Sequence, residues 1–203
     1  MTKKILSLGS DGKLVLIGPE GKVEDIPRAP NSFSHLVIDC SGSMEGNKLT
    51  QAKKGSIDFA RDAIKKGYAI GLIKFDSSAR LLCEPVIDIN VICHHIEELA
   101  AGDTTNMAHG IQVALQSLNP RKGTRAIIVV TDGIPDDAQA ALNAAQHAKD
   151  RGIDVITIGT DDADKAFLNR LASRSDLAVK VSSDQLGQSI ASAAKMLPGG
   201  TNG

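Results

Sequence analysis

Leu36-Val37-Ile38 runs directly into Asp39-Cys40-Ser41-Gly42-Ser43-Met44, and this stretch decides the fold. The all-apolar run predicts a buried strand, and the small polar residues after it predict a loop. The next segment, from about residue 47 to residue 66, predicts an amphipathic helix whose apolar face carries Leu49, Ala52, Phe59, Ala60 and Ala63. A buried strand, a polar loop and an amphipathic helix form the first unit of an α/β fold.

Strands and helices alternate in the same way from Ser32 onward. Apolar runs predict strands over 69–75, 126–130, 155–158 and 177–181, and Pro85 restricts a weaker strand over 80–86 to a sheet edge. Helical periodicity predicts helices over 89–100, 107–118, 138–148, 164–173 and 184–197. This alternation predicts a Rossmann-like, doubly wound, mostly parallel six-strand sheet flanked by helices.

Residues 1–31 follow a different pattern, with apolar stretches at 5–8, 14–17 and 23–26 separated by glycine-rich turns. This pattern predicts an N-terminal β-meander extension that ends in the linker Pro27-Arg28-Ala29-Pro30. The meander either covers an edge of the main sheet or offers a surface for strand addition or dimerisation. We therefore divide the chain into this extension, a main domain over 32–197 and a flexible tail over 198–203.

Composition and charge argue against binding to nucleic acid or to anionic membranes. The 203 residues include 23 Lys plus Arg and 24 Asp plus Glu, which leaves a formal net charge of −1 and no basic surface for phosphate groups. Aromatic residues make up only 2%, so platforms for base stacking are not expected.

The cysteines and the N-terminus favour a cytoplasmic location. Cys40, Cys83 and Cys93 are an odd set without metal-binding spacing, which argues against a disulfide framework or a structural zinc site. The N-terminal apolar stretch is shorter than the roughly 7–15 residues of a secretory signal. No run approaches the ~18 apolar residues of a membrane span.

Polar side chains follow three of the predicted elements at what should be one edge of the sheet. The first strand ends in Asp39-Cys40-Ser41-Gly42-Ser43, the helix at 107–118 is preceded by Gly102-Asp103-Thr104-Thr105-Asn106, and the strand at 126–130 runs into Thr131-Asp132-Gly133. If the first loop is extended, its alternation places Asp39, Ser41 and Ser43 on one side, and Gly42 allows a tight turn between the serines. Carboxylate and hydroxyl oxygens are the donors that Mg²⁺ prefers.

This combination resembles the metal-ion-dependent adhesion site of the von Willebrand factor A domain family. The motif is Asp-x-Ser-x-Ser after the first strand, a threonine about 60 residues later and Thr-Asp-Gly after a central strand, and the resemblance covers about Ser32 to Leu197. It implies a Mg²⁺ site, for which Mn²⁺ and Ca²⁺ are alternatives. The implied ligands are Asp39, Ser41, Ser43, Thr105 and Asp132.

The choice of threonine follows the family pattern, in which Asn or His comes after the ligand. Thr105-Asn106 matches this order, whereas Thr104 stands one residue early and remains the alternative. Asp136 and Asp137 are expected to interact with the positive end of the following helix.

We interpret the chain as a non-enzymatic, Mg²⁺-dependent protein-interaction module of stand-alone intracellular type. Three of the five implied ligands are neutral hydroxyls, so a bound ion stays short of negative donors and favours an Asp or Glu from a protein partner. Some intracellular members of the family work with AAA+ ATPases, and the sequence leaves open whether this one does. The rival hypothesis is a hydrolase that uses Mg²⁺ as a Lewis acid, with His109 as the nearest general base.

Overall fold

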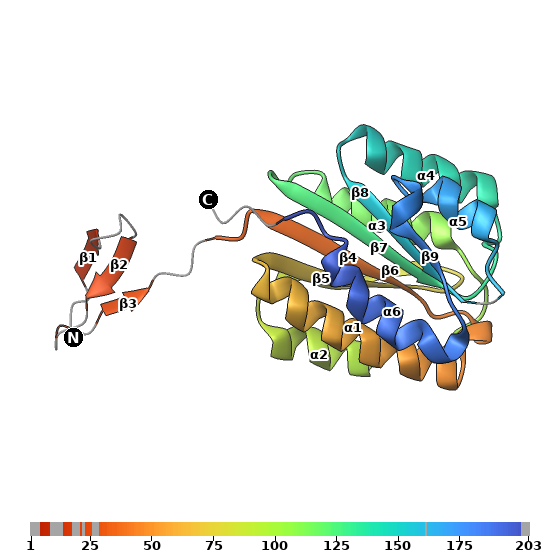
Figure 1. Ribbon diagram of the computed structural model, residues 1–203, viewed down its shortest axis with the longest axis horizontal. Coiled ribbons are helices and arrows are strands. Elements are labelled where there is room, and N and C mark those ends of the chain that lie inside the picture. Colours follow the sequence, from red (N-terminus) through yellow and green to blue (C-terminus); the bar gives the residue numbers. More distant parts are fainter. Residues whose placement is uncertain are drawn as a thin grey trace.

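The computed structural model describes residues 5–8, 14–17, 21, 23–25, 29–160 and 162–199, and its main body is a sheet between two layers of helices (Figure 1). The sheet has six strands in the order β6-β5-β4-β7-β8-β9. All neighbouring pairs are parallel except β5 and β6. The strands are β4 (Ser32–Asp39), β5 (Tyr68–Phe75), β6 (Ala79–Val86), β7 (Thr124–Thr131), β8 (Asp154–Gly159) and β9 (Ala178–Lys180). The predicted fold class and the edge position of β6 are confirmed.

Each face of the sheet has its own apolar core because successive side chains of β4 point to opposite faces. Leu36 and Ile38 pack with helices α1 (Asn47–Lys65), α2 (Ile89–Glu97) and α6 (Leu186–Ser192). Val37 packs on the other face with α3 (Met107–Leu118), α4 (Ala138–Asp150) and α5 (Lys165–Leu171). The central strands are therefore buried on both faces, as their all-apolar sequences predict.

The C-terminal segment differs from the single helix predicted over 184–197. It consists of a 3-10 turn at Ser183–Gln185, helix α6 and a second 3-10 turn at Ala193–Lys195. The segment contains Gly187 and several serines, which are weak α-helix formers. In the part of the chain that the structure describes, none of the helices is both long and apolar enough to cross a membrane.

The N-terminal strands β1 (Ile5–Leu8), β2 (Leu14–Ile17) and β3 (Val23–Asp25) pair in antiparallel fashion, as the sequence predicts. They form a three-stranded sheet of their own. The described strands therefore do not extend the six-stranded sheet by pairing with it. Residues 27–28 of the predicted linker and residues 200–203 of the predicted tail lie outside the described residues.

The order of the strands determines where polar loops meet. β4 lies between β5 and β7, and Ile38 is opposite Val130 in the parallel register. The carboxyl ends of β4 and β7 therefore lie side by side, at the point where the chain turns to the other half of the sheet. Doubly wound sheets bind their ligands at this position.

Candidate metal site

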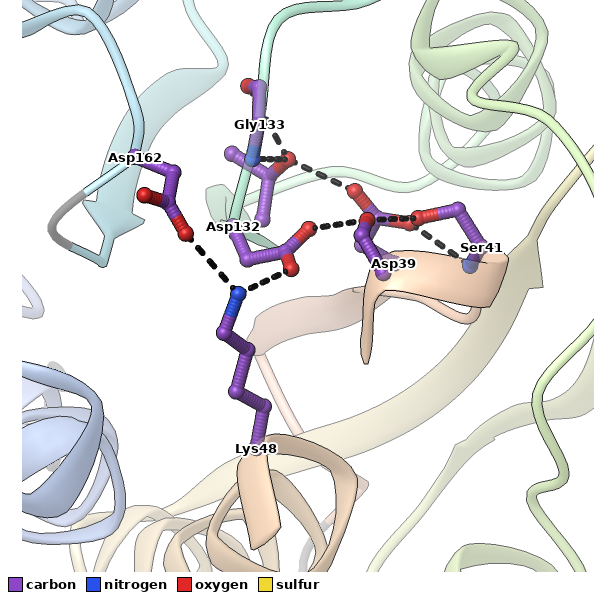
Figure 2. A network of polar contacts seen from close by, with 8 residues as sticks. Asp39, Ser41, Lys48, Asp132, Gly133 and Asp162 are labelled. Atoms are coloured by element: carbon purple, nitrogen blue, oxygen red, sulfur yellow. Dashed lines mark hydrogen bonds and ion pairs between the residues drawn. The ribbon is translucent and has the colours of Figure 1, made fainter. Parts of the chain in front are cut away.

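Asp39 is the last residue of β4 and is completely buried. Its Oδ1 accepts a hydrogen bond from the backbone N–H of Ser41 at 2.9 Å, and its Oδ2 accepts one from the hydroxyl of Thr131 at 2.6 Å (Figure 2). Burial raises the pKa of this carboxyl group, and the hydrogen bonds from Thr131 and Ser41 oppose the rise. The fold thus fixes the Asp39 carboxylate by contacts within its own loop and with β7.

Two serines connect this loop to Asp132, which follows β7. The hydroxyl oxygens of Ser41 and Ser43 are 3.1 Å apart, and Ser43 donates to Asp132 Oδ1 at 2.8 Å. Ser41 and Asp132 are each only 1% exposed, whereas Ser43 is exposed. The loop is not extended as expected, because Ser43 lies in a 3-10 turn over Gly42–Met44. The turn nevertheless brings the two serine hydroxyls together.

Gly42 allows a close approach of the loop that precedes α3. Its N–H donates to the carbonyl of Asp103 at 2.9 Å, and the N–H of Gly102 donates to the carbonyl of Cys40 at 2.6 Å. A Cβ at residue 42 would lie 3.3 Å from the carbonyl oxygen of Gly102. The chain turns tightly from Gly42 onward, as expected, but Gly42 does not have a positive φ angle, so a glycine is favoured there by the lack of space rather than by the backbone conformation.

Thr105 lies on this second loop, and its described hydrogen bonds involve its backbone rather than its hydroxyl. Its N–H donates to Asp136 Oδ2 at 3.2 Å, and its carbonyl accepts from the N–H of Asp136 at 3.1 Å. The Asp136 carboxylate therefore holds the Thr105 loop, a contact that the sequence did not predict, because the chain after β7 passes beside that loop. Asp137 behaves as predicted, since its carboxylate caps α4 by accepting from Ala140 N at 2.8 Å.

Lys48 belongs to the site although the sequence motifs did not point to it. Its Nζ lies 2.7 Å from Asp132 Oδ2 and 3.0 Å from Asp162 Oδ2 (Figure 2). Burial acts to lower the pKa of Lys48, but hydrogen bonds and charge interactions with both carboxylates outweigh it and raise the pKa. The sequence does contain a signal: a lysine in the first turn of a helix faces the positive end of the helix dipole, so a nearby anion is expected.

The set of donors fits Mg²⁺. The carboxylates of Asp39 and Asp132 and the hydroxyls of Ser41 and Ser43 supply oxygen only, which is the chemistry that Mg²⁺ prefers. In the described ranges, three or more His, Cys, Asp or Glu side chains never gather in a way that could hold a metal ion. A metal at this site therefore needs the serine hydroxyls.

His109, the candidate base of the rival hydrolase hypothesis, is engaged in the fold. Its Nδ1 accepts a hydrogen bond at 3.0 Å from the backbone N–H of Ala79, the first residue of β6. A nitrogen that accepts an N–H bond is not free to remove a proton from a water molecule. The geometry thus gives His109 a structural role, joining α3 to β6.

Comparisons with known proteins show which family and fold the chain resembles. The family model of the von Willebrand factor type A domain matches residues 35–193. A UPF0353 protein of Mycolicibacterium gilvum is 30% identical over 174 residues, which cover 76% of this chain and 51% of that protein. The chain spans about half the length of the curated relatives it matches.

Solved structures share the fold at low sequence identity. The vWF domain of the type V pili tip protein Mfa5 from Porphyromonas gingivalis has a TM-score of 0.74 at 15% identity, covering 83% of this chain and 95% of that one. Proximal thread matrix protein 1 from the mussel byssus has a TM-score of 0.69 at 18% identity, covering 83% and 46%. In that mussel structure, zinc occupies the MIDAS motif, the metal-ion-dependent adhesion site.

Proposed function

Because the chain belongs to the von Willebrand factor type A domain family, a fold of metal-dependent adhesion and protein interaction, we propose that it is a Mg²⁺-dependent protein-binding module. The observation that carries the proposal is the chain of contacts from Asp39, through the backbone N–H of Ser41 and the hydroxyls of Ser41 and Ser43, to Asp132. These oxygens come from the adjacent ends of β4 and β7, where doubly wound sheets bind their ligands.

Each residue of the site has a proposed role in holding the ion. Asp39, Ser41, Ser43 and Asp132 would hold the ion, directly or through water, and Thr105 would complete the set from the loop before α3. The ion would supply a positive centre at the protein surface. The exposed Ser43 marks the side from which a partner reaches this centre.

The partner would contribute a carboxylate. Hard oxygen anions are favoured ligands of Mg²⁺, and a site that includes neutral hydroxyls leaves coordination positions to be filled. An Asp or Glu side chain of another protein satisfies this need. The ion in the MIDAS motif of the mussel protein supports metal binding by this fold, and there the metal is zinc.

A cytoplasmic location and a function alongside an AAA+ ATPase remain parts of the proposal. The three cysteines are free thiols, which suits a reducing compartment. An ATPase partner would have to bind through a surface acidic residue, which makes this version testable by the same experiment as the general one.

The experiment has two stages. Calorimetric titration of the purified chain with Mg²⁺ should show one ion bound per chain, and Ser43→Ala should weaken this binding. The immobilised chain should then retain a partner from native extract in Mg²⁺ and release it in EDTA. Ser43→Ala should fail to retain that partner.

Ser175→Ala is the matched control, since Ser175 is exposed and lies in a 3-10 turn before β9. It should behave as wild type in both stages. If wild type does not bind Mg²⁺, or if retention is the same in EDTA, the proposed function is wrong.

A further inference from the structure

Lys48 joins three elements around Asp132. It is the second residue of α1, Asp132 follows β7, and Asp162 lies on the segment after β8. Asp132 is 1% exposed and Asp162 is 72% exposed, so the ammonium group bridges a buried and a solvated carboxylate. Figure 2 shows Lys48 reaching up from α1 to both carboxylates.

The two oxygens of Asp132 have different partners. Oδ1 accepts from Ser43 and faces the serine hydroxyls, whereas Oδ2 is paired with Lys48. An unpaired carboxylate at this depth would be costly, so the lysine stabilises Asp132 in the absence of any other cation. The same positive charge repels a divalent ion that approaches the Oδ1 side.

We propose that Lys48 is a tethered counter-ion that competes with Mg²⁺ for Asp132, and that Asp162 holds the lysine when the metal binds. The inference rests on the proposed metal site and adds a control of its affinity. Without metal, Lys48 neutralises Asp132. With metal, the charge on Asp132 is satisfied by the ion, and Asp162 becomes the main partner of Lys48.

This arrangement connects metal affinity to the segment after β8. A change that draws Asp162 away from Lys48 leaves the lysine with Asp132 alone and weakens Mg²⁺ binding. A partner that contacts Asp162 would therefore alter the metal site without touching a metal ligand. Lys48 acts through Asp132, so it is a positioning residue for the site.

The test measures Mg²⁺ affinity by calorimetry in two single variants and in the double variant. Lys48→Met should bind Mg²⁺ about threefold to tenfold more tightly, because a positive charge near the ion is removed. Asp162→Asn should bind it about twofold to threefold more weakly. In the double variant, Asp162→Asn should add almost nothing, because its effect passes through Lys48.

Thermal unfolding gives a second readout. Without metal, Lys48→Met should melt at a lower temperature than wild type, since Asp132 has lost its counter-ion, and Mg²⁺ should raise its melting temperature by more than it raises that of wild type. Lys65→Met is the matched control on the same helix. Lys65 is 70% exposed and pairs with Asp62 at 3.3 Å, so its loss should leave Mg²⁺ affinity unchanged.

A simple structural role for Lys48 predicts the opposite sign, because a damaged site binds metal more weakly. Weaker or unchanged Mg²⁺ binding in Lys48→Met would overturn the inference while leaving the proposed function in place. Lys48→Gln, which keeps hydrogen-bond donors without the charge, should reproduce the tighter binding if the methionine variant folds poorly. Failure of wild type to bind Mg²⁺ would instead overturn the proposed function itself.

Discussion

Two buried polar side chains of β4, His35 and Asp39, lie four residues apart on the same face of the strand and have different surroundings. His35 is in the middle of the strand, opposite Gly71 of β5 and Ile127 of β7. Its ring occupies the space where Gly71 has no side chain. Asp39 is at the strand's end, where three polar loops meet.

The partners of His35 lead away from the metal site. Its Nε2 lies 2.8 Å from the hydroxyl of Ser117, which donates to Glu84 Oε2 at 2.7 Å. Because the Ser117 proton is used in that bond, Nε2 is the donor to Ser117. Burial lowers the pKa of His35 to about 4, more than the nearby Glu84 raises it. Nδ1 has no partner among the described residues.

The difference shows that the position of a buried polar group along a strand determines which partners it can have. In the middle of the sheet, burial keeps His35 uncharged although Glu84 of β6 favours the charged form. At the end of the strand, loops supply hydroxyls that also contact a second carboxylate, and a cation can satisfy them together. Substitutions at the two positions should therefore have different consequences.

The largest effect should come from removing the carboxylate at the strand end. Asp39→Ala should abolish measurable Mg²⁺ binding in calorimetry while circular dichroism keeps its helix and sheet signal, because a core of this size does not depend on a metal. Asp58→Ala, on the exposed face of α1, is the control. Unchanged Mg²⁺ binding in Asp39→Ala would place the metal elsewhere.

Acid should lower the free energy of unfolding through His35, the histidine in the middle of β4. The unfolded chain binds a proton at His35 below about pH 6.5, and the folded chain binds it only near pH 4. The contribution of His35 is therefore complete above pH 6.5 and is lost as the pH falls towards 4, at a cost of about 3 kcal/mol. His35→Gln should remove this part of the pH dependence in denaturant unfolding. Parallel curves for the two proteins would contradict the assignment.

The sheet and the polar residues at its strand ends were predictable from the sequence, because apolar periodicity and strand-end motifs are local signals. The all-apolar runs predicted the six-strand sheet, and the Asp-x-Ser-x-Ser motif predicted that Asp39 and the serines would lie together. Asp132 joins them through Ser43, as expected from two neighbouring strand ends. The roles of these residues as metal ligands remain predictions.

The rest depended on contacts between distant segments. Lys48 meets Asp162 across 114 residues, and Asp136 meets Thr105 across 31. His109 turns towards Ala79 because α3 packs beside β6, which no local pattern indicates. Sequence reasoning therefore identified the residues at the strand ends more reliably than the side chains that connect the loops.

Substituting Thr105 should reduce Mg²⁺ binding less than substituting Asp39 does. Thr105 is the one proposed ligand that no described hydrogen bond links to the other four. Thr105→Ala should reduce Mg²⁺-dependent retention of a partner by about tenfold and Mg²⁺ affinity by less than about threefold, since one neutral donor is lost and four ligands remain. Calorimetry and recovery from extract measure the two effects. If the variant recovers the partner as well as wild type does, Thr104→Ala becomes the variant to test.

The smallest effect should come from loosening the loop that carries Thr105. Asp136→Ala removes the acceptor of the Thr105 N–H while leaving every proposed metal ligand in place. We expect Mg²⁺ affinity to fall by about twofold to threefold, because one exposed hydrogen bond to a carboxylate contributes modestly.

Asp137→Ala is the control variant for Asp136→Ala. It removes the cap of α4 and should lower the free energy of unfolding by about 1 kcal/mol without changing Mg²⁺ affinity. Calorimetry and denaturant unfolding on both variants separate the two roles. Equal Mg²⁺ affinities in wild type and Asp136→Ala would show that the backbone contacts of the loop fix its position without the Asp136 carboxylate.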